Sequence, residues 1–585
     1  MRFFNKRQDQ PAEVVAVSQV PDKSAAEAES EGSTCIDATG NRLDAGKLQS
    51  GVARIEATTK IWSRKHLIAA YLMIWFLYFV KSIEEVVHYS LAAFVTSSFG
   101  MHSTTPAISI VAKIIGGVTY IPLAKILDTW GRPQGLALML LIWVLGNIMM
   151  AACQNIETYA AANVFHTVGG QGVSYCVTIF VADTSSLLNR PLMLAFATSP
   201  YIITTWIGGP VTEAVLSGPG LRWGLGMWAI ILPIVVLPLS ILFLYNDRKA
   251  VKAGLIEKRT GWITPKDVRN YLIAVDFVGI ILLAGGWTLL LLPFSIWSYQ
   301  AEQFRAPIII CMLIFGPVLL IVFALWERFL APITFIPYKL LLDRTVFSTG
   351  IMFIFLYASS AIWGGYFQSM LLVVWDTGIR DATYIGNIYR VGSCLASVFI
   401  GIAVNRVGKF KWVATYYAFP LSLLGVGLMI KFRQASEHIG LVIMTQVFIA
   451  FAGGPVVVAG EMAMMAPSDH QHVAVIIAIL NLFCSIGAAV GSTVSTAIWT
   501  GTFRNELLAN LPADAPVDVI YGSLKEQLKY PVGSAIRDGI SLSYSQSQRY
   551  MLITSVILLA AAWACTWLWR DLKLKKIKQV TGTVV

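Results

Sequence analysis

The sequence predicts an all-α protein that crosses a membrane many times, and its composition is the first reason. Of its 585 residues 56% are apolar and only 13% are charged, and the mean hydropathy is +0.66. Soluble proteins carry roughly a quarter of charged residues, so this chain cannot cover a water-facing surface of its size. The seven cysteines are scattered without a C-x-x-C pair, which argues against a disulfide framework and a cysteine metal site.

Apolar runs of the right length are the second reason, because a membrane-spanning helix needs about 20 mostly apolar residues. We expect fourteen spans, near residues 67–94, 106–126, 134–153, 159–182, 192–215, 224–245, 271–292, 306–326, 346–371, 383–404, 412–430, 439–463, 473–500 and 550–569.

The distribution of positive charge is the third reason, and it predicts the orientation. Lys and Arg gather in residues 1–65, in residues 246–270 and in the C-terminal tail. Cytoplasmic segments of membrane proteins carry such an excess, so we expect both termini in the cytosol. The net charge of +11 is then a topology signal, and no nucleic-acid partner is expected.

The polar segments divide the chain into parts. The predicted outer loop contains an amphipathic stretch at 519–528, which favours a folded loop over a disordered one. The parts are a disordered cytosolic segment (1–65), a six-span bundle (66–245), a basic cytosolic loop (246–270), spans seven to thirteen (271–500), a folded extracellular loop (501–548), span fourteen (549–569) and a basic cytosolic tail (570–585).

A short motif follows the second span. Asp128, Gly131 and Arg132 stand in the stretch A-K-I-L-D-T-W-G-R-P, and a weaker copy, N-R-V-G-K at 405–409, follows the tenth span. The D-x-x-G-R core resembles the signature of the major facilitator superfamily at this loop. The resemblance implies a tight glycine turn with Asp128 and Arg132 pairing across a helix interface that breaks and re-forms. The alternative is a polar turn shaped only by the positive-inside rule.

Further stretches resemble one family, the fungal siderophore–iron transporters of the major facilitator superfamily, over about residues 60–570. The resemblance implies two six-helix bundles with two extra spans, for which spans seven and eight are candidates and other assignments remain open. It also implies proton-coupled uptake (symport) of ferric siderophores across the plasma membrane, with passage through endosomal vesicles as a further option. The stretches are A-D-T-S-S-L-L-N-R (182–190), S-P-Y-I-I-T (199–204), G-G-P (208–210), L-D-R-T-V-F (342–347), Y-F-Q-S (366–369) and G-K-F-K (408–411).

Two other classes of function compete. A fourteen-span drug–proton antiporter that exports amphipathic compounds has the same fold, but its G-P-x-x-G-G motif is altered here because Glu213 replaces a glycine. An enzyme would need a nucleophile–base pair or a metal site, and neither pattern is visible; a phosphate-binding G-x-x-x-x-G-K-[ST] is also missing. We therefore expect no enzyme and no cofactor, with iron arriving as a chelate. The bilayer, protons and a ferric siderophore are the expected partners of a monomer, and hydroxamate and catecholate chelates both remain open.

Charged residues inside the spans are the candidate site, because each costs roughly 2.5–3.5 kcal/mol at the bilayer centre. Spacing of i, i+3, i+4 and i+7 places four residues of span one on one stripe. The functional interpretation is a wet cavity in which one carboxylate takes up a proton while cations orient an oxygen-rich ligand; the alternative is internal pairing. The sequence does not say which Glu titrates. The candidates are Lys81, Glu84, Glu85 and His88 on the stripe, with Lys113, His166, Glu213, Tyr389 and Arg390 on other spans.

Two further groups complete the expectations. Asp183, Asp276 and Glu461 lie near inner span ends, and we interpret them mainly as interfacial or gating groups. In the outer loop, the resemblance implies a role in substrate handling, and Arg537 and Tyr544 are the candidates for it.

Overall fold

The computed structural model describes residues 35–36, 42–43, 62–99, 105–185, 188–253, 265–274, 276–297, 300, 302–331, 342–467, 473–572 and 574. The chain divides into two compact units, Met1–Leu48 and Gln49–Val585. Within the first, β1 (Cys35–Ile36) pairs antiparallel with β2 (Arg42–Leu43). The predicted disordered segment 1–65 lies otherwise almost wholly outside the described residues, and its last two residues already belong to a helix.

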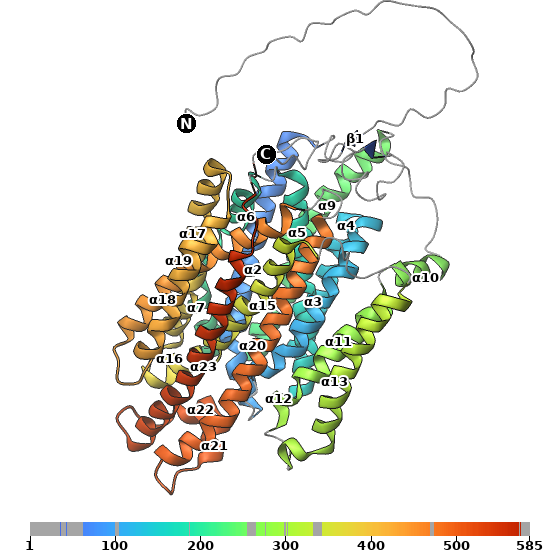
Figure 1. The fold of residues 1–585 in the computed structure, drawn as a ribbon. Helices are drawn as coiled ribbons and strands as arrows, with labels where there is room; N and C mark the ends of the chain where they lie inside the picture. Colours follow the sequence, from blue (N-terminus) through green and yellow to red (C-terminus); the bar gives the residue numbers. More distant parts are fainter. Residues whose placement is uncertain are drawn as a thin grey trace, which may run out of the picture. The chain divides into compact units, whose positions relative to one another are not determined.

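The second unit is helical, and thirteen of its described helical segments are long and apolar enough to cross a membrane, with a shorter apolar helix in addition. This confirms the predicted all-α polytopic architecture (Figure 1). The first half, called the N half, contains α2 (Arg64–Ser98), α3 (Thr105–Thr129), α4 (Arg132–Ala152), α5 (Ile156–Thr184), α6 (Arg190–Thr198), α7 (Tyr201–Ser217), α8 (Leu221–Gly226) and α9 (Trp228–Lys252).

The second half, called the C half, repeats the arrangement after an intervening segment. It contains α15 (Arg344–Gly364), α16 (Phe367–Val374), α17 (Ile379–Val407), the π-helical η6 (Val413–Ala418), α18 (Phe419–Phe432), α19 (Ile439–Met465), α20 (Val473–Asn510) and α23 (Ala535–Trp567). The halves meet along two equivalent helix pairs, because α3 packs on α20 and α17 packs on α7. We call this contact surface the inter-half interface.

Several predicted spans are broken into two helices. Span five divides into α6 and α7 at Pro200, and span nine divides into α15 and α16 at Tyr366, whose φ is +57°. Proline lacks the backbone N–H that a continuous helix needs, which explains the first break. A hydropathy window cannot see such breaks because the apolar character continues through them.

The segment between the halves forms a helical hairpin. It contains α10 (Pro265–Ala274), α11 (Phe277–Leu291), α12 (Pro293–Ile296), the 3₁₀ turn η4 (Gln303–Arg305), α13 (Pro307–Leu325) and the π-helical η5 (Trp326–Leu330). Here α11 and α13 pack closely, since a Cβ on Gly316 would lie 2.6 Å from the backbone nitrogen of Leu290. The hairpin touches α3 through α11 and α20 through α12, and it lies at one edge of the bundle (Figure 1). This edge position fits the expectation that spans seven and eight are the additional pair.

The outer loop is shorter than the predicted 501–548. The helix α20 continues to Asn510 and α23 already begins at Ala535, so both extend past the apolar runs. Their extensions carry polar residues on one side, which a hydropathy window interprets as loop. Between them stand α21 (Val517–Gly522) and α22 (Leu524–Gln527), within the stretch predicted to be amphipathic, and α22 lies against α2 of the N half.

Candidate functional site

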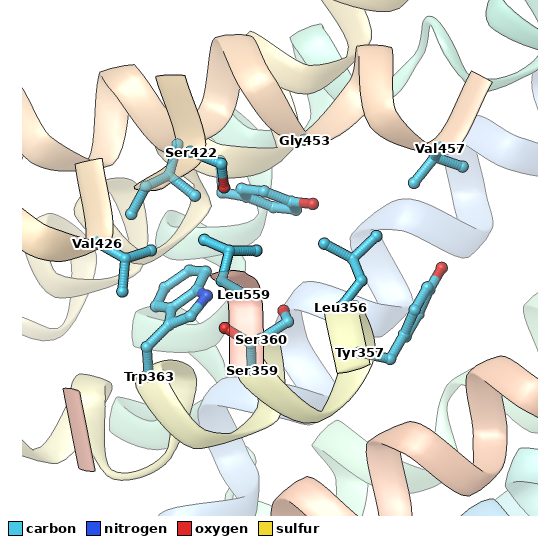
Figure 2. Close-up of a pocket in the computed structure, with 12 residues that line it drawn as sticks. Leu356, Tyr357, Ser359, Ser360, Trp363, Ser422, Val426, Gly453, Val457 and Leu559 are labelled. Carbon is cyan, nitrogen blue, oxygen red and sulfur yellow. The ribbon is translucent and has the colours of Figure 1, made fainter. Parts of the chain in front are cut away.

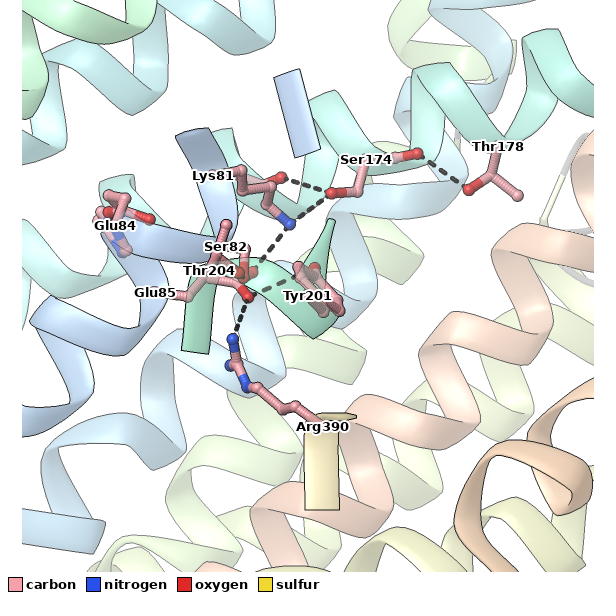
Figure 3. A network of polar contacts seen from close by, with 11 residues as sticks. Lys81, Ser82, Glu84, Glu85, Ser174, Thr178, Tyr201, Thr204 and Arg390 are labelled. Atoms are coloured by element: carbon pink, nitrogen blue, oxygen red, sulfur yellow. Dashed lines mark hydrogen bonds and ion pairs between the residues drawn. The ribbon is translucent and has the colours of Figure 1, made fainter. Parts of the chain in front are cut away.

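Three predicted residues form an ion-pair network at the inter-half interface. Glu85 on α2 binds Lys81 of the same helix at 2.9 Å and Arg390 on α17 at 3.1 Å (Figure 3). Lys81 also donates to the Ser174 hydroxyl on α5, and the Arg390 guanidinium lies 5.4 Å from the centre of the Tyr201 ring. These five residues are called the interface network. Two cations hold one carboxylate, and one of them comes from the opposite half.

The other residues of the span-one stripe belong to a different cluster inside the N half. Glu84 is 1% exposed and pairs with His166 on α5, and His88 stacks on the His166 ring with centroids 4.5 Å apart. Trp143 on α4 packs edge-on against the same imidazole at 6.4 Å. We call these four residues the histidine cluster. The predicted stripe therefore divides between two partners, because the α2 turn carrying it is enclosed on more than one side.

The remaining predicted span residues do not join either group. Lys113 on α3 donates to the Ser492 hydroxyl of α20 at 2.6 Å, which places it at the inter-half interface. Glu213 is exposed near the outer end of α7 and forms no ion pair with any described residue. Tyr389 faces α19 instead, where a Cβ on Gly453 would collide with its ring.

On the predicted inner side the motif after span two pairs with a neighbouring helix. Arg132 binds Asp183 at the end of α5 at 3.3 Å, and a gating role for that aspartate stays a prediction. The side chain of Asp128 lies outside the described residues, so its predicted pairing with Arg132 stays a prediction. Gly131 has φ +112° and Gly408 in the weaker copy has φ +76°. Both are conformations that other residues rarely adopt, so the predicted glycine turn is present in both halves.

Direct contacts join the halves on the predicted inner side as well. Asn405 donates from Nδ2 to the Asn189 Oδ1 at 2.7 Å, and the Tyr175 hydroxyl donates to the Ala474 carbonyl at 2.7 Å. Arg190, which sequence reasoning missed, is 0% exposed and donates to the Ala182 carbonyl and to Met465 Sδ of the C half. Because Arg190 follows span four directly, the positive-inside rule alone explains its charge. The sequence therefore gives no sign that its side chain is buried.

The outer-loop candidates are buried and bind protein groups. The Arg537 guanidinium is 2% exposed; it donates to the carbonyls of Val373, Gln527, Tyr530 and Leu372 and pairs with Asp376 at 3.1 Å. Tyr544 donates to the Gln527 side-chain oxygen at 2.9 Å. Both residues thus fasten α22 and α23 to the end of α16, and their direct handling of substrate stays a prediction.

A cavity lies inside the C half and is shown in Figure 2. Its volume is about 160 Å³, and hydroxyl and aromatic groups share its wall with aliphatic ones. The lining residues are Leu356, Tyr357, Ser359, Ser360 and Trp363 of α15, Tyr389 of α17, Ser422 and Val426 of α18, Ile449, Gly453 and Val457 of α19, and Leu559 of α23. We call it the C-half cavity. Among the described residues no group of three His, Cys, Asp or Glu side chains gathers as metal ligands, and carriage of iron as a chelate stays a prediction.

Two helical halves that meet along equivalent helix pairs have the architecture of the major facilitator fold. Solved transporters share this fold. A bacterial homologue of the human lysosomal transporter Spinster, inward-facing and unoccupied, matches with a TM-score of 0.52 at 13% identity, over 87% of this chain and 98% of that one. An auto-inhibited peptide transporter of the POT family matches with a TM-score of 0.50 at 13% identity, over 88% and 100%.

Sequence relatives then identify the family, although no family model matches the chain. MFS siderochrome iron transporter 1 of Ajellomyces capsulatus is 49% identical over 540 residues, which are 92% of each chain. MFS siderochrome iron transporter D of Aspergillus fumigatus is 39% identical over 92% of this chain and 90% of its own, and siderophore iron transporter 1 of Schizosaccharomyces pombe is 33% identical over 87% and 82%. The chain belongs to the fungal siderochrome iron transporter family of the major facilitator superfamily.

Proposed function

We propose that this protein carries ferric siderophore complexes into the cell across the plasma membrane, coupled to proton entry. The observation that carries the substrate class is the 49% identity, over 92% of both chains, to a relative named as a siderochrome iron transporter. In this proposal the protein is a monomer with both termini in the cytosol. It carries iron in the form of the chelate and has no cofactor of its own.

The contacts between the halves support alternating access. The pair of Glu85 and Arg390 joins the halves at 3.1 Å, while Asn405 and Asn189 join them at 2.7 Å on the inner side. Rocking of one bundle against the other exchanges such contacts, so that one face opens while the other stays closed. The C-half cavity of about 160 Å³ is small for a ligand, since pockets for drug-sized molecules span roughly 300–1,000 Å³. This cavity lies inside one half and is too small for a bulky chelate, so we infer that the chelate binds between the halves.

The charges at the interface suit an oxygen-rich ligand. Lys113 binds a neutral hydroxyl, that of Ser492, and no carboxylate among the described residues. Arg390 is about one-third exposed, so its guanidinium can also meet a ligand at the interface. Cations of this kind bind the negatively polarised oxygens around a chelated metal through charge-assisted hydrogen bonds.

Uptake by cells tests this proposal. The protein is expressed in cells that lack other siderophore carriers, and radiolabelled ferrioxamine B, a hydroxamate, is compared with ferric enterobactin, a catecholate. We expect uptake of at least one chelate, faster at acidic external pH and abolished by a protonophore. If the proton gradient is held constant, depletion of ATP should have little effect on the rate of uptake. Uptake that survives loss of the proton gradient would refute symport, and uptake of neither chelate at normal surface level would refute the substrate class.

A further inference from the structure

A single carboxylate, Glu461, stands on α19 one helical turn beyond the last residue with which this helix lines the C-half cavity. Ile449, Gly453 and Val457 line the cavity from α19, each four residues from the next. Residues four apart share one face of a helix, so Glu461 is the next group on this face. Figure 2 shows Val457 and Tyr357 together at one end of the cavity, which is the end nearest Glu461 along α19.

Glu461 is mostly buried and has no cation to neutralise it within the described part of the chain. No described residue forms a hydrogen bond or an ion pair with its side chain; instead its charge acts on the Tyr357 hydroxyl of α15 and the Cys484 thiol of α20. Tyr120 of α3 interacts with the same tyrosine and thiol, so the surroundings of Glu461 include the N half. An unpaired carboxylate in such a place is strongly disfavoured when ionised.

Several titratable and charged groups on the elements that pack against α19 are already engaged. Besides Tyr357 and Cys484, Tyr389 of α17 lines the cavity, Arg390 of α17 binds Glu85, and Cys394 of α17 donates to the Thr198 carbonyl. Tyr417 of η6 donates to the Phe451 carbonyl, and from the N half Arg190 donates to Met465, one turn beyond Glu461. The two carboxylates of span one differ from Glu461 in this respect. Glu85 is held by two cations, so its protonation would break existing ion pairs, and Glu84 contacts the His166 imidazole directly.

We propose that Glu461 is the carboxylate whose protonation couples proton entry to transport, while Glu84 and Glu85 hold the helices together. This inference rests on the proposed symport. The carboxylate takes up one proton from water that enters from the outer side, which changes its charge from negative to neutral. It releases the proton toward the cytosol when the inner side opens. The neutral form removes the free-energy cost of a lone charge at the interface and so lets the halves repack around it.

Infrared spectroscopy tests the protonation without any substrate. The difference spectrum of the purified protein between acidic and alkaline buffer should contain the C=O band of a protonated carboxylic acid. Glu461→Gln should remove this band, whereas Glu157→Gln, an exposed carboxylate in the first turn of α5, should keep it. A band that is unchanged in Glu461→Gln would overturn the proposal. This outcome is independent of which chelate is carried.

Transport by proteoliposomes tests the coupling, with radiolabelled ferrioxamine B and ferric enterobactin as probes. An inward gradient of about one pH unit should drive about tenfold accumulation by the wild-type protein if one proton enters per chelate. Glu461→Gln should lose this accumulation but keep the exchange of labelled for unlabelled chelate at equal pH. Accumulation by the variant with the wild-type pH profile would overturn the role of Glu461. Failure of the wild-type protein to respond to the gradient would instead overturn the proposed symport.

A variant that keeps the carboxyl group controls for folding. If Glu461→Gln lacks both transport modes, Glu461→Asp decides the matter, because it retains a titratable group at a shifted position. A shifted pH profile of accumulation in the Asp variant supports the proposal. The opposite outcome has two parts: thermal unfolding shows that the inactive Gln variant is folded, and the Asp variant keeps the wild-type pH profile. This outcome refutes the proposal and makes Glu461 a structural residue.

Discussion

Arg390 reaches from α17 to Glu85 on α2, and their 3.1 Å ion pair ties the two halves of the protein together across the interface. Lys81 binds the second oxygen of the same carboxylate at 2.9 Å. Glu85 therefore keeps one partner when the halves separate, and only Arg390 must change its contacts.

Removal of this pair should shift the balance between the closed and open forms. We expect Arg390→Gln to reduce uptake and to increase labelling of a cysteine placed at Ser90, which contacts Thr383 of the C half. A hydrogen bond to a charged group contributes about 1.5–3 kcal/mol, so the change in labelling should be roughly tenfold or more. The variant Lys431→Gln, which changes an exposed cation at the end of α18, serves as the control. Labelling at the wild-type rate in Arg390→Gln would show that the pair does not hold the interface closed.

The two glutamates of span one should respond differently to neutralisation. Glu84 is buried against His166, so Glu84→Ala should lower the melting temperature by an amount equivalent to about 3–5 kcal/mol, as expected for a broken buried pair. Glu85→Gln should fold normally and lower the transport rate, since it weakens contacts between the halves. Thermal unfolding and uptake across a pH series measure both effects. Loss of the pH dependence in Glu85→Gln alone would move the proton site to span one.

The glycine turn on the inner side should not accept a side chain. Gly131 has φ +112° and ψ 163°, a region that only glycine adopts readily, so Gly131→Ala should cost about 1–3 kcal/mol of strain. The matched control is Gly427→Ala in α18, where an added Cβ would have no atom within 4 Å. We expect the first variant to bind chelate but to transport slowly, and the control to transport normally. Equal transport rates in both variants would show that the glycine turn has no role in the conformational cycle of transport.

The outer loop should depend on its buried fastening residues more than on its surface charge. Arg537→Ala and Tyr544→Ala leave several carbonyls and the Gln527 side chain without partners, so each should lower stability by about 1–3 kcal/mol per unsatisfied group and reduce uptake. Lys525→Ala changes an exposed charge in the same loop and should have little effect. Surface level, melting temperature and uptake kinetics are measured together. Normal stability with altered substrate affinity in Tyr544→Ala would instead favour direct contact with the chelate.

Apolar runs were sufficient to predict the order of the spans, because lipid requires about 20 apolar residues whatever the partners of the helix are. Thirteen of the fourteen predicted spans correspond to helices long enough to cross a membrane, and the seventh corresponds to the shorter α11. It could not predict where α20 ends, since Asn510 lies in a polar extension that the C half stabilises by packing. The stripe of Lys81, Glu84, Glu85 and His88 was visible from its spacing, yet its division into two clusters depends on the helices that enclose it. The position of Glu461 near a span end predicts an interfacial or gating group. It does not reveal whether a Lys or Arg side chain lies near the carboxylate in the folded protein.

The attachment of α22 in the predicted outer loop has a consequence for inhibition of the proposed carrier. Arg537 ties α22 to the carbonyls at the end of α16, and α22 in turn lies against α2 of the other half. The halves cannot part on this face unless α22 leaves α2. A molecule that clamps α22 onto α2, such as an antibody fragment, would hold the halves together on this face without having to enter the bilayer or resemble the proposed substrate.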